Sequence, residues 1–526
     1  MRRLHVCMDG KVVGVLEQSP HGRLQFTYDA AWTALPGVRP ISLSLPFAGS
    51  PFDDADVRSF FAGYLPDDPE ALRLIGERFG VSSGSLFGLL AAVGRDCAGA
   101  LAVTAPDEAC PNDADRDPAF SILDVAALAD VLEELARRPL LAGPDRLRLS
   151  LAGVQSKTGV YVTEAGDIAL PVDAYPTTHI LKPEPHGDFP DLALLEHACL
   201  EMARELGLPA VRSRIGQAGG RRYLLVERYD RIRGPGGRVR RLHQEDFCQA
   251  LGVPGSSKYE QDGGPGLAAC FALCDRLSVP GRQRLRLLDA VLFNFLVGNA
   301  DAHAKNFSVL YTEAGSELAP LYDLVSTLVY EADPQMRMNT DMAMRIGRRY
   351  DARLVLPSDW QHLASATGFR WTAMRDRLED MSRRLPAAAI HVERALVAGA
   401  AATPLLHRAI DLLLARCEHV RESHGLDPVA VEALPARMRD GAGQVIEPIL
   451  ELRHRFDRKV RERLGTWAEE RRRARLAGLM DEVARLRMLH DAVARAHAAW
   501  TAGTASAEQR DLLRQQLGAL PDDAVS

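Results

Sequence analysis

Short alternating runs of hydrophobic and polar residues dominate the first half of the chain, and helical periodicities dominate the second half. Residues 4–16 alternate around the turn at Asp9-Gly10, which predicts a pair of strands, and helical patterns follow between residues 57 and 90. Short runs rich in β-branched and aromatic residues predict further strands at 160–162 and 179–182. Segments 212–215 and 223–226 are expected to pair as strands across the turn at Gly219-Gly220. Most of the chain after residue 240 has a helical pattern. This order predicts a small sheet followed by a helical body.

Helix and linker signals divide the chain further. Apolar residues recur at helical spacing from Pro190 to Leu206, and Gly207 follows as a stop signal. Segment 104–118 is polar, rich in proline and unperiodic, which is typical of a linker or long surface loop. The amphipathic pattern at 444–500 favours a helical hairpin with a charged face, and a partner-binding or coiled-coil role is the alternative. We therefore predict four units, at 1–118, 119–240, 241–440 and 441–526.

Composition narrows the class of protein. The 526 residues are 47% hydrophobic and 25% charged, which is ordinary globular usage, and the net charge of −6 does not indicate a nucleic-acid coat. The N-terminal residues do not read as a signal peptide, and charges interrupt the Ala-rich stretch 386–415, so we expect no membrane span. The eight cysteines form no Cys-x-x-Cys pair, so we expect reduced thiols in a cytoplasmic protein, without a disulfide framework or structural zinc.

A strongly apolar helix is predicted from Arg282 to Val297, and Gly298 ends it. A polar loop containing Asp301 and Asn306 comes next. Two strands are then expected, at 307–311 and 318–322, with Asp323 at the end of the second. Helix, polar loop, hairpin and acid follow each other as in the catalytic segment of a protein kinase.

This order matters because phosphoryl transfer requires positioned charge more than covalent chemistry. A carboxylate must orient and deprotonate the attacking hydroxyl, and oxygen ligands must hold magnesium on the nucleotide phosphates. Asp301 and Asn306 have the kinase spacing Asp-x-x-x-x-Asn, and Asp323 stands where a further metal ligand belongs. The alternative for Asp301 alone is an ordinary turn residue after a helix, and the surrounding elements favour the chemical interpretation.

Two further kinase elements have candidates upstream. Lys182 ends a predicted strand, and Glu196 borders the apolar stripe of the next helix, so the two side chains are expected to pair, with Glu201 or Glu205 as alternatives. The small residues Ala152 and Gly153 lie in a loop, 150–158, that could cover phosphates with its backbone N–H groups. A Walker A motif is rejected because Leu151 and Ser156 stand where it requires glycine.

Seven runs in this order resemble the HipA toxin family of serine/threonine kinases. They are Leu149 to Thr158, His179 to Pro183, Val226 to Arg231, His243 to Ala250, Lys258 to Glu260, Gly298 to Asn306, and Tyr322-Asp323. Ser42 to Pro46, Phe60-Phe61 and Gly94 to Ala100 also resemble the family's first subdomain, so the resemblance covers roughly residues 1–435. It implies an α+β, bilobal, protein-kinase-like fold: a small N-terminal subdomain, a strand-rich lobe, a helical lobe and a helical extension.

The resemblance also implies an ATP- and Mg²⁺-dependent site. Asp301 would be the catalytic base, Asn306 and Asp323 would bind magnesium, and Lys182 would hold the nucleotide phosphates. The remaining nucleotide contacts would come from Ala152, Gly153, Val154, Gln155, Lys157, Glu227, Tyr229, Gln244 and His303. Ser150 would be autophosphorylated, which would expel the loop and switch the kinase off because its added charge repels ATP.

Partners follow from the resemblance alone. Family substrates are typically aminoacyl-tRNA synthetases, whose phosphorylation arrests growth, and the usual partner is a helix-turn-helix antitoxin of the HipB type that binds operator DNA. Two alternatives remain: a small-molecule kinase or AMP transferase, and an idle scaffold acting as co-repressor. The chain departs from the family at Arg345 to Arg348, where contacts with substrate could differ. It also departs beyond about residue 440, where a helical, arginine-rich extension could replace, recruit or dispense with an antitoxin.

Overall fold

The computed structural model describes residues 1–113, 116–135, 156–172, 175–185, 187, 189–331, 341–427 and 506. Its strands are β1 (Arg2–Met8), β2 (Lys11–Gln18), β3 (Leu24–Tyr28), β4 (Ala102–Thr104), β5 (Phe120–Ile122), β6 (Thr158–Val162), β7 (Ile168–Pro171), β8 (His179–Pro183), β9 (Ser213–Ala218), β10 (Arg221–Glu227), β11 (Arg231–Arg233), β12 (Val239–Arg241), β13 (His243–Asp246), β14 (Ser308–Thr312), β15 (Gly315–Leu318), β16 (Asp341–Ile346) and β17 (Arg349–Asp351). Its helices are α1 (Ala30–Thr33), α2 (Asp54–Phe61), α3 (Pro69–Phe79), α4 (Leu86–Val93), α5 (Val125–Leu135), α6 (Leu192–Glu205), α7 (Phe247–Leu251), α8 (Leu267–Cys274), α9 (Pro280–Val297), α10 (Leu328–Glu331), α11 (Pro357–Thr367), α12 (Trp371–Ala398) and α13 (Pro404–Ser423).

Residues 1–104, here called the N-terminal unit, contain a four-stranded sheet in the order β3-β2-β1-β4. The predicted first turn is present: Asp9 and Gly10 both have positive φ, at 49° and 74°, between the antiparallel strands β1 and β2. Helices α2, α3 and α4 fill the segment in which helical patterns were predicted. Phe26, Phe60 and Phe61 are fully buried in the core of this unit.

The second sheet has six strands in the order β5-β7-β6-β8-β10-β9, and strand β10, between β8 and the edge strand β9, shows how the two faces differ. Leu224 and Val226 point into one core, while Tyr223 and Leu225 point into another, as the alternation of a strand requires. The sheet core, which contains Leu225, also contains Leu181 of β8, side chains of α5 and the interior of the N-terminal unit. The helical core, which contains Leu224, includes α6, α8, α9, α12 and α13.

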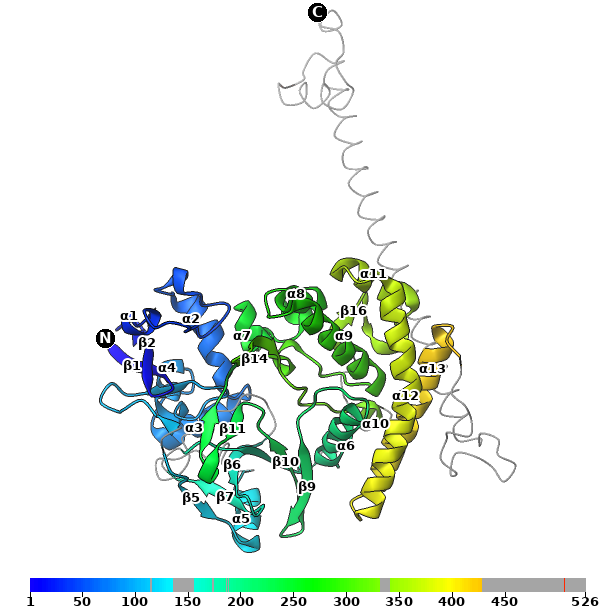
Figure 1. Cartoon of the computed structure of the whole chain (residues 1–526), viewed down its shortest axis with the longest axis horizontal. Helices are drawn as coiled ribbons and strands as arrows, with labels where there is room; N and C mark the ends of the chain where they lie inside the picture. Colours follow the sequence, from blue (N-terminus) through cyan, green and yellow to red (C-terminus); the bar gives the residue numbers. More distant parts are fainter. Residues whose placement is uncertain are drawn as a thin grey trace, which may run out of the picture. The chain divides into compact units, whose positions relative to one another are not determined.

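Helix α6 therefore packs with the helices of the chain's second half. Ala193, Leu194 and Cys199 of α6 are at most 1% exposed and belong to the helical core. The start of α6 is fixed by two hydrogen bonds: Tyr330 of α10 donates to the Pro190 carbonyl (2.8 Å), and Thr403 donates to Asp191 (2.6 Å). Figure 1 shows α12 and α13 running side by side next to α6.

Helix α9 ends at Gly298 as predicted, because this residue takes the left-handed conformation at φ 69°. The chain then forms a polar loop and the strands β14 and β15, which join β13 in a three-stranded sheet in the order β13-β14-β15. The prediction of a second strand at 318–322 ending at Asp323 was wrong. Strand β15 ends at Leu318, because Pro320 offers no N–H and Leu321 bonds instead to the segment after α6, donating to Pro209 (2.7 Å).

The prediction that all cysteines are unpaired thiols was also wrong. Cys7 of β1 and Cys110 form a disulfide with a Cα–Cα distance of 5.5 Å, while six other cysteines are free and buried. Their approach follows from the loop after β4, which folds back so that Pro111 accepts a hydrogen bond from Gly10 (3.0 Å). Residue spacing cannot reveal this pairing, since 103 positions separate the two cysteines.

The N-terminal unit is attached to the rest of the chain through buried polar groups. Asp96 pairs with Arg231 (2.8 Å), and the Asp230 carboxylate accepts from the Gly99 N–H (2.7 Å) and from Arg228 (2.8 Å). Burial acts to raise the pKa of Asp96, but the neighbouring guanidinium groups outweigh it and lower that pKa below its ordinary value. These contacts fix the N-terminal unit beside the end of β10.

Several predictions concern residues outside the described part. The hairpin at 444–500, the unit at 441–526 and most of the loop 150–158 lie there, and only Ser156, Lys157 and Thr158 of that loop are described. In the described ranges, no helix combines the length and the apolar character that crossing a membrane requires.

Candidate functional site

A cleft of about 780 Å³ lies between the six-stranded sheet, the loop after α9 and the N-terminal unit. Its lining includes ten of the residues predicted from sequence: Lys157, Lys182, Glu196, Glu227, Tyr229, Gln244, Asp301, His303, Asn306 and Asp323. Ser150, Ala152, Gly153, Val154 and Gln155 lie outside the described residues. The cleft therefore brings together every predicted site residue that the structure describes.

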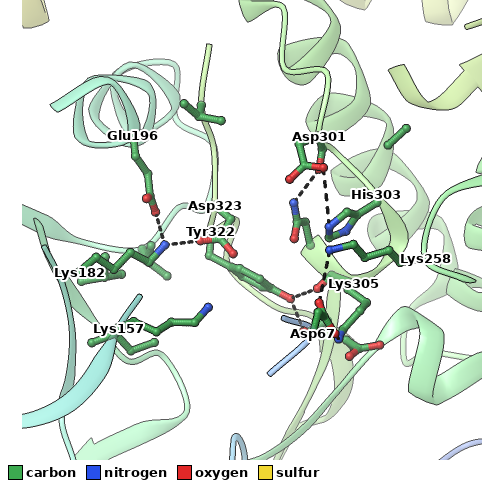
Figure 2. Close-up of a pocket in the computed structure, with 18 of the residues that line it drawn as sticks. Asp67, Lys157, Lys182, Glu196, Lys258, Asp301, His303, Lys305, Tyr322 and Asp323 are labelled. Carbon is green, nitrogen blue, oxygen red and sulfur yellow. Dashed lines mark hydrogen bonds and ion pairs between the residues drawn. The ribbon is translucent and has the colours of Figure 1, made fainter. Parts of the chain in front are cut away.

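Lys182 occupies the centre of a charged group at one side of the cleft (Figure 2). Its ammonium group donates to Glu196 Oε1 at 2.7 Å and also forms a short ion pair with Asp323. Burial acts to lower the pKa of Lys182, but Asp323 and Glu196 raise it above its ordinary value, so the lysine stays charged. Of the three glutamates predicted as candidates, Glu196 forms the ion pair with Lys182. Glu201 instead lies 3.9 Å from Arg204, and Glu205 lies 3.6 Å from His391.

Asp323 has an unusual backbone: its φ is 51°, in the left-handed region that non-glycine residues rarely adopt. Such conformations cluster at functional sites, because the surrounding structure must hold them. Burial acts to raise the pKa of Asp323, yet Lys182 and Lys157 lower it, so this carboxylate is ionised. Burial also lowers the pKa of Lys157 to about 8, with Asp323 opposing the shift and Lys182 adding to it.

The loop after α9 presents Asp301 to the cleft. The Asp301 N–H donates to Asn299 Oδ1 (3.0 Å). Asn306 Nδ2 donates to the Asp301 carbonyl (2.9 Å), so the amide oxygen of Asn306 is the atom of this side chain left to bind a ligand. Tyr259 donates its hydroxyl proton to Asp301 Oδ1 (2.7 Å). One oxygen of the Asp301 carboxylate is thus held by Tyr259, and the side chain remains 49% exposed.

His303 lies beside Asp301, with 3.9 Å between Nε2 and Oδ1 (Figure 2). Burial lowers its pKa to about 4, partly opposed by Asp301, so the imidazole is neutral at pH 7. Its Nδ1 is buried and finds no hydrogen-bond partner within the described ranges. A buried polar atom without a partner in a cleft is a candidate contact for a bound ligand.

Aromatic side chains also line the cleft. The rings of Tyr229 and Tyr322 stack with centroids 5.8 Å apart, and the Tyr229 hydroxyl donates to Gln244 in a short hydrogen bond. Tyr322 donates to the Lys305 carbonyl (2.8 Å). Glu227 ends β10 next to this pair. A flat, mostly apolar surface with a few fixed polar groups suits a planar ring.

The residues around Asp301 also include some to which sequence reasoning gave no role. Tyr259 lies in a run, Lys258 to Glu260, that was noted only as part of the family pattern. Lys305 stands directly before Asn306, and Asp67 comes from the N-terminal unit (Figure 2). No local pattern distinguishes Asp67 from other surface acids, so only its docked position could have identified it.

The donor set fits a magnesium-bound nucleotide. Mg²⁺ in such sites takes one or two carboxylates together with phosphate oxygens and water, and Asp323 and Asn306 could offer a carboxylate and an amide oxygen in the cleft that Lys182 also lines. Within the described part of the chain, no three His, Cys, Asp or Glu side chains are grouped closely enough to hold a metal by themselves.

Comparison with known proteins agrees with this geometry. The family model of the HipA N-terminal domain matches residues 4–104, and that of the HipA-like C-terminal domain matches residues 149–389. A kinase candidate from Sinorhizobium fredii, Y4mE, is 43% identical over 386 residues, which are 72% of this chain and 89% of that protein. The serine/threonine-protein kinase toxin HipA of Shewanella oneidensis is 30% identical over 365 residues, which are 67% of this chain and 81% of that protein.

A solved structure gives the same result. The complex of Shewanella oneidensis HipA with HipB and its operator DNA matches at a TM-score of 0.67 and 27% identity, covering 81% of this chain and all of that one. The predicted α+β, kinase-like fold is thereby confirmed, and so is the predicted protein kinase. This chain belongs to the HipA family of protein kinases.

Proposed function

We propose that this chain is an ATP- and Mg²⁺-dependent serine/threonine kinase that acts as the toxin of a toxin–antitoxin module. The observation that carries the proposal is the convergence of Lys182, Asp301, Asn306 and Asp323 on one cleft. Two acids, an amide and a lysine in one cleft are the groups that phosphoryl transfer requires. The name of the Shewanella relative supports the toxin role.

Each residue has a defined task in this proposal. Asp301 accepts the proton of the substrate hydroxyl through the oxygen that Tyr259 leaves available. Lys182, fixed by Glu196, holds the phosphates, and Lys157 adds positive charge next to it. Asp323 and Asn306 would hold Mg²⁺, which neutralises charge on the phosphates when it is bound. Tyr229, Gln244, His303 and Glu227 form the remaining surface for the nucleotide.

Substrate, partner and self-modification are also part of the proposal. By family resemblance the protein substrate is a translation enzyme of the aminoacyl-tRNA synthetase class. The partner is an antitoxin of the HipB type, supported by the solved HipA–HipB–operator DNA complex of the Shewanella relative. DNA contact would be indirect, through that antitoxin. Autophosphorylation of Ser150 would close the site to ATP, because about two negative charges would be added beside the phosphates.

The direct test is phosphoryl transfer from labelled ATP. Wild-type protein incubated with γ-labelled ATP and a cell extract should transfer label to protein, and Asp301→Asn should not. Label transferred only from α-labelled ATP would instead indicate AMP transfer. Growth arrest that persists in Asp301→Asn would contradict the kinase mechanism and favour a scaffold. Mass spectrometry of cells expressing wild type or Asp323→Ala should locate the lost phosphosite.

A further inference from the structure

The N-terminal unit places one carboxylate inside the kinase cleft. Asp67 lies in the loop before α3, and its Oδ1 is 2.5 Å from Lys305 Nζ while its Oδ2 is 3.3 Å from Lys258 Nζ. Figure 2 shows Asp67 facing these two lysines beside the loop that carries Asp301. This one side chain thus joins two separate segments of the helical half of the chain.

The position of Asp67 is fixed by the docking of the N-terminal unit. Gln249 of α7 donates to the Phe60 carbonyl (3.0 Å), and its own conformation is held by a capping box with Asp246. Gly63 approaches Gln249 so closely that a Cβ there would lie 2.7 Å from the Gln249 side chain. The chain thus meets α7 tightly four residues before Asp67, which leaves little freedom to move away.

Both lysines stand next to residues of the proposed reaction centre. Lys305 directly precedes Asn306, and Lys258 directly precedes Tyr259, whose hydroxyl holds the Asp301 carboxylate. A shift of either lysine backbone would therefore move a metal ligand or the group that orients the base. Misplacement of reacting groups by about 1 Å can cost roughly 100-fold in rate.

Asp67 is the carboxylate that bonds to both ammonium groups. The side chains of Lys305 and Lys258 are 4% and 11% exposed, so water cannot replace a lost partner well. Burial acts to lower the pKa of Lys305, while Asp246 and Asp67 raise it, so the lysine is charged in the folded protein. Without the Asp67 carboxylate, the buried ammonium groups of Lys305 and Lys258 would repel each other across the space that it occupies. The chain segments that carry the two lysines would then move apart.

We propose that Asp67 is a positioning residue for phosphoryl transfer, through which the N-terminal unit completes the kinase site. The inference rests on the proposed roles of Asp301 and Asn306. It assigns to the N-terminal unit an indirect part in the reaction, because a residue of that unit holds the segments that carry the reaction centre in place. Asp67 touches neither the hydroxyl nor the phosphates in this assignment and acts through Lys305 and Lys258.

The experiment compares Asp67→Asn with wild type and with Asp68→Asn. Asp68 caps α3 by accepting from Glu70 N (3.1 Å), and asparagine caps equally well, so this neighbouring change is a matched control. Steady-state transfer of γ-labelled phosphate should show kcat lowered about 10- to 100-fold in Asp67→Asn, with the KM for ATP within about twofold of wild type. Asp68→Asn should match wild type in both.

A combined variant tests whether Asp67 acts through the two lysines. If it does, adding Asp67→Asn to a protein that already carries Lys305→Met and Lys258→Met should lower kcat little further, whereas multiplied losses would overturn the inference. The inference would also be overturned if the kcat of Asp67→Asn were within twofold of wild type. It would be overturned as well if thermal unfolding showed that the loss of kcat equals the loss of folded protein. If wild type itself transfers no phosphate, the proposed function fails rather than the role of Asp67.

Discussion

Replacing Glu196 with glutamine tests the buried ion pair that holds Lys182, the lysine proposed to bind the nucleotide phosphates. The change keeps the shape of the side chain but removes its charge. Both partners are 5% exposed and 2.7 Å apart, so the lysine would lose a close, poorly screened counter-charge. Lys182 would then be held by Asp323 alone and drawn towards it. That shift would move the lysine off the phosphates and occupy a proposed magnesium ligand.

The magnitude follows from the burial of the pair. At 2.7 Å and an effective dielectric constant of about 20, the attraction is about 6 kcal/mol, most of which desolvation offsets. Removing one partner of a buried pair usually costs about 3–5 kcal/mol. Since Asp323 still neutralises part of the lysine charge, we expect a loss of about 2 kcal/mol, which corresponds to about 30-fold in kcat/KM for ATP.

The assay is steady-state phosphoryl transfer at varied ATP, together with thermal unfolding to establish the folded fraction. Glu201→Gln and Glu205→Gln are matched controls, because both residues lie on α6 and pair with other groups, Arg204 and His391. Both should retain wild-type kinetics. The reasoning is refuted if Glu196→Gln keeps kcat/KM within twofold of wild type, or if either control loses as much.

Two further predictions address the base and the docking of the N-terminal unit. Tyr259→Phe removes the hydroxyl that lies 2.7 Å from Asp301 and should lower kcat about 10-fold without changing the KM for ATP, so an unchanged kcat would contradict its orienting role. Burial raises the pKa of Glu245 from 4.5 to about 7, although Ser42 and Tyr311 donate hydrogen bonds to it. The folded protein therefore holds this proton more tightly than the unfolded chain, and the free energy of unfolding should fall by about 3 kcal/mol as pH rises from about 4.5 to 7. In Glu245→Gln the free energy of unfolding should depend less on pH. Chemical denaturation of wild type and Glu245→Gln across this pH range measures it, and the same pH dependence in both proteins would contradict the raised pKa of Glu245.

The parts of the site that sequence could predict are those built from neighbouring residues. Helix α9, its end at Gly298 and the spacing of Asp301 and Asn306 all depend on local periodicity and one left-handed residue. The position of Glu196 beside the apolar stripe of α6 predicts its pairing with Lys182, because helical periodicity determines which side chains share a face. Where local pattern and tertiary position agree, the prediction and the structure coincide.

The remainder depends on contacts between distant segments. Asp67 and Lys305 are 238 positions apart, and Cys7 and Cys110 are 103 apart, so no window of sequence contains both members of either pair. The early end of β15 has a local cause, Pro320, but the bond between Leu321 and Pro209 replaces strand pairing only because α6 returns the chain there. Such features require the docked fold.

The way in which β10 divides its side chains between the two cores has a consequence for the pair of Lys182 and Glu196. Lys182 follows Leu181, whose side chain is packed in the sheet core, whereas Glu196 projects from a helix anchored in the helical core. Strand β10 pairs with β8 and contributes Leu224 to the helical core, so the strand that carries Lys182 and the helix that carries Glu196 are both tied to β10. The 2.7 Å bond therefore joins two elements that cannot separate without exposing buried apolar side chains, and the alignment of the lysine is built into the rigid frame around it.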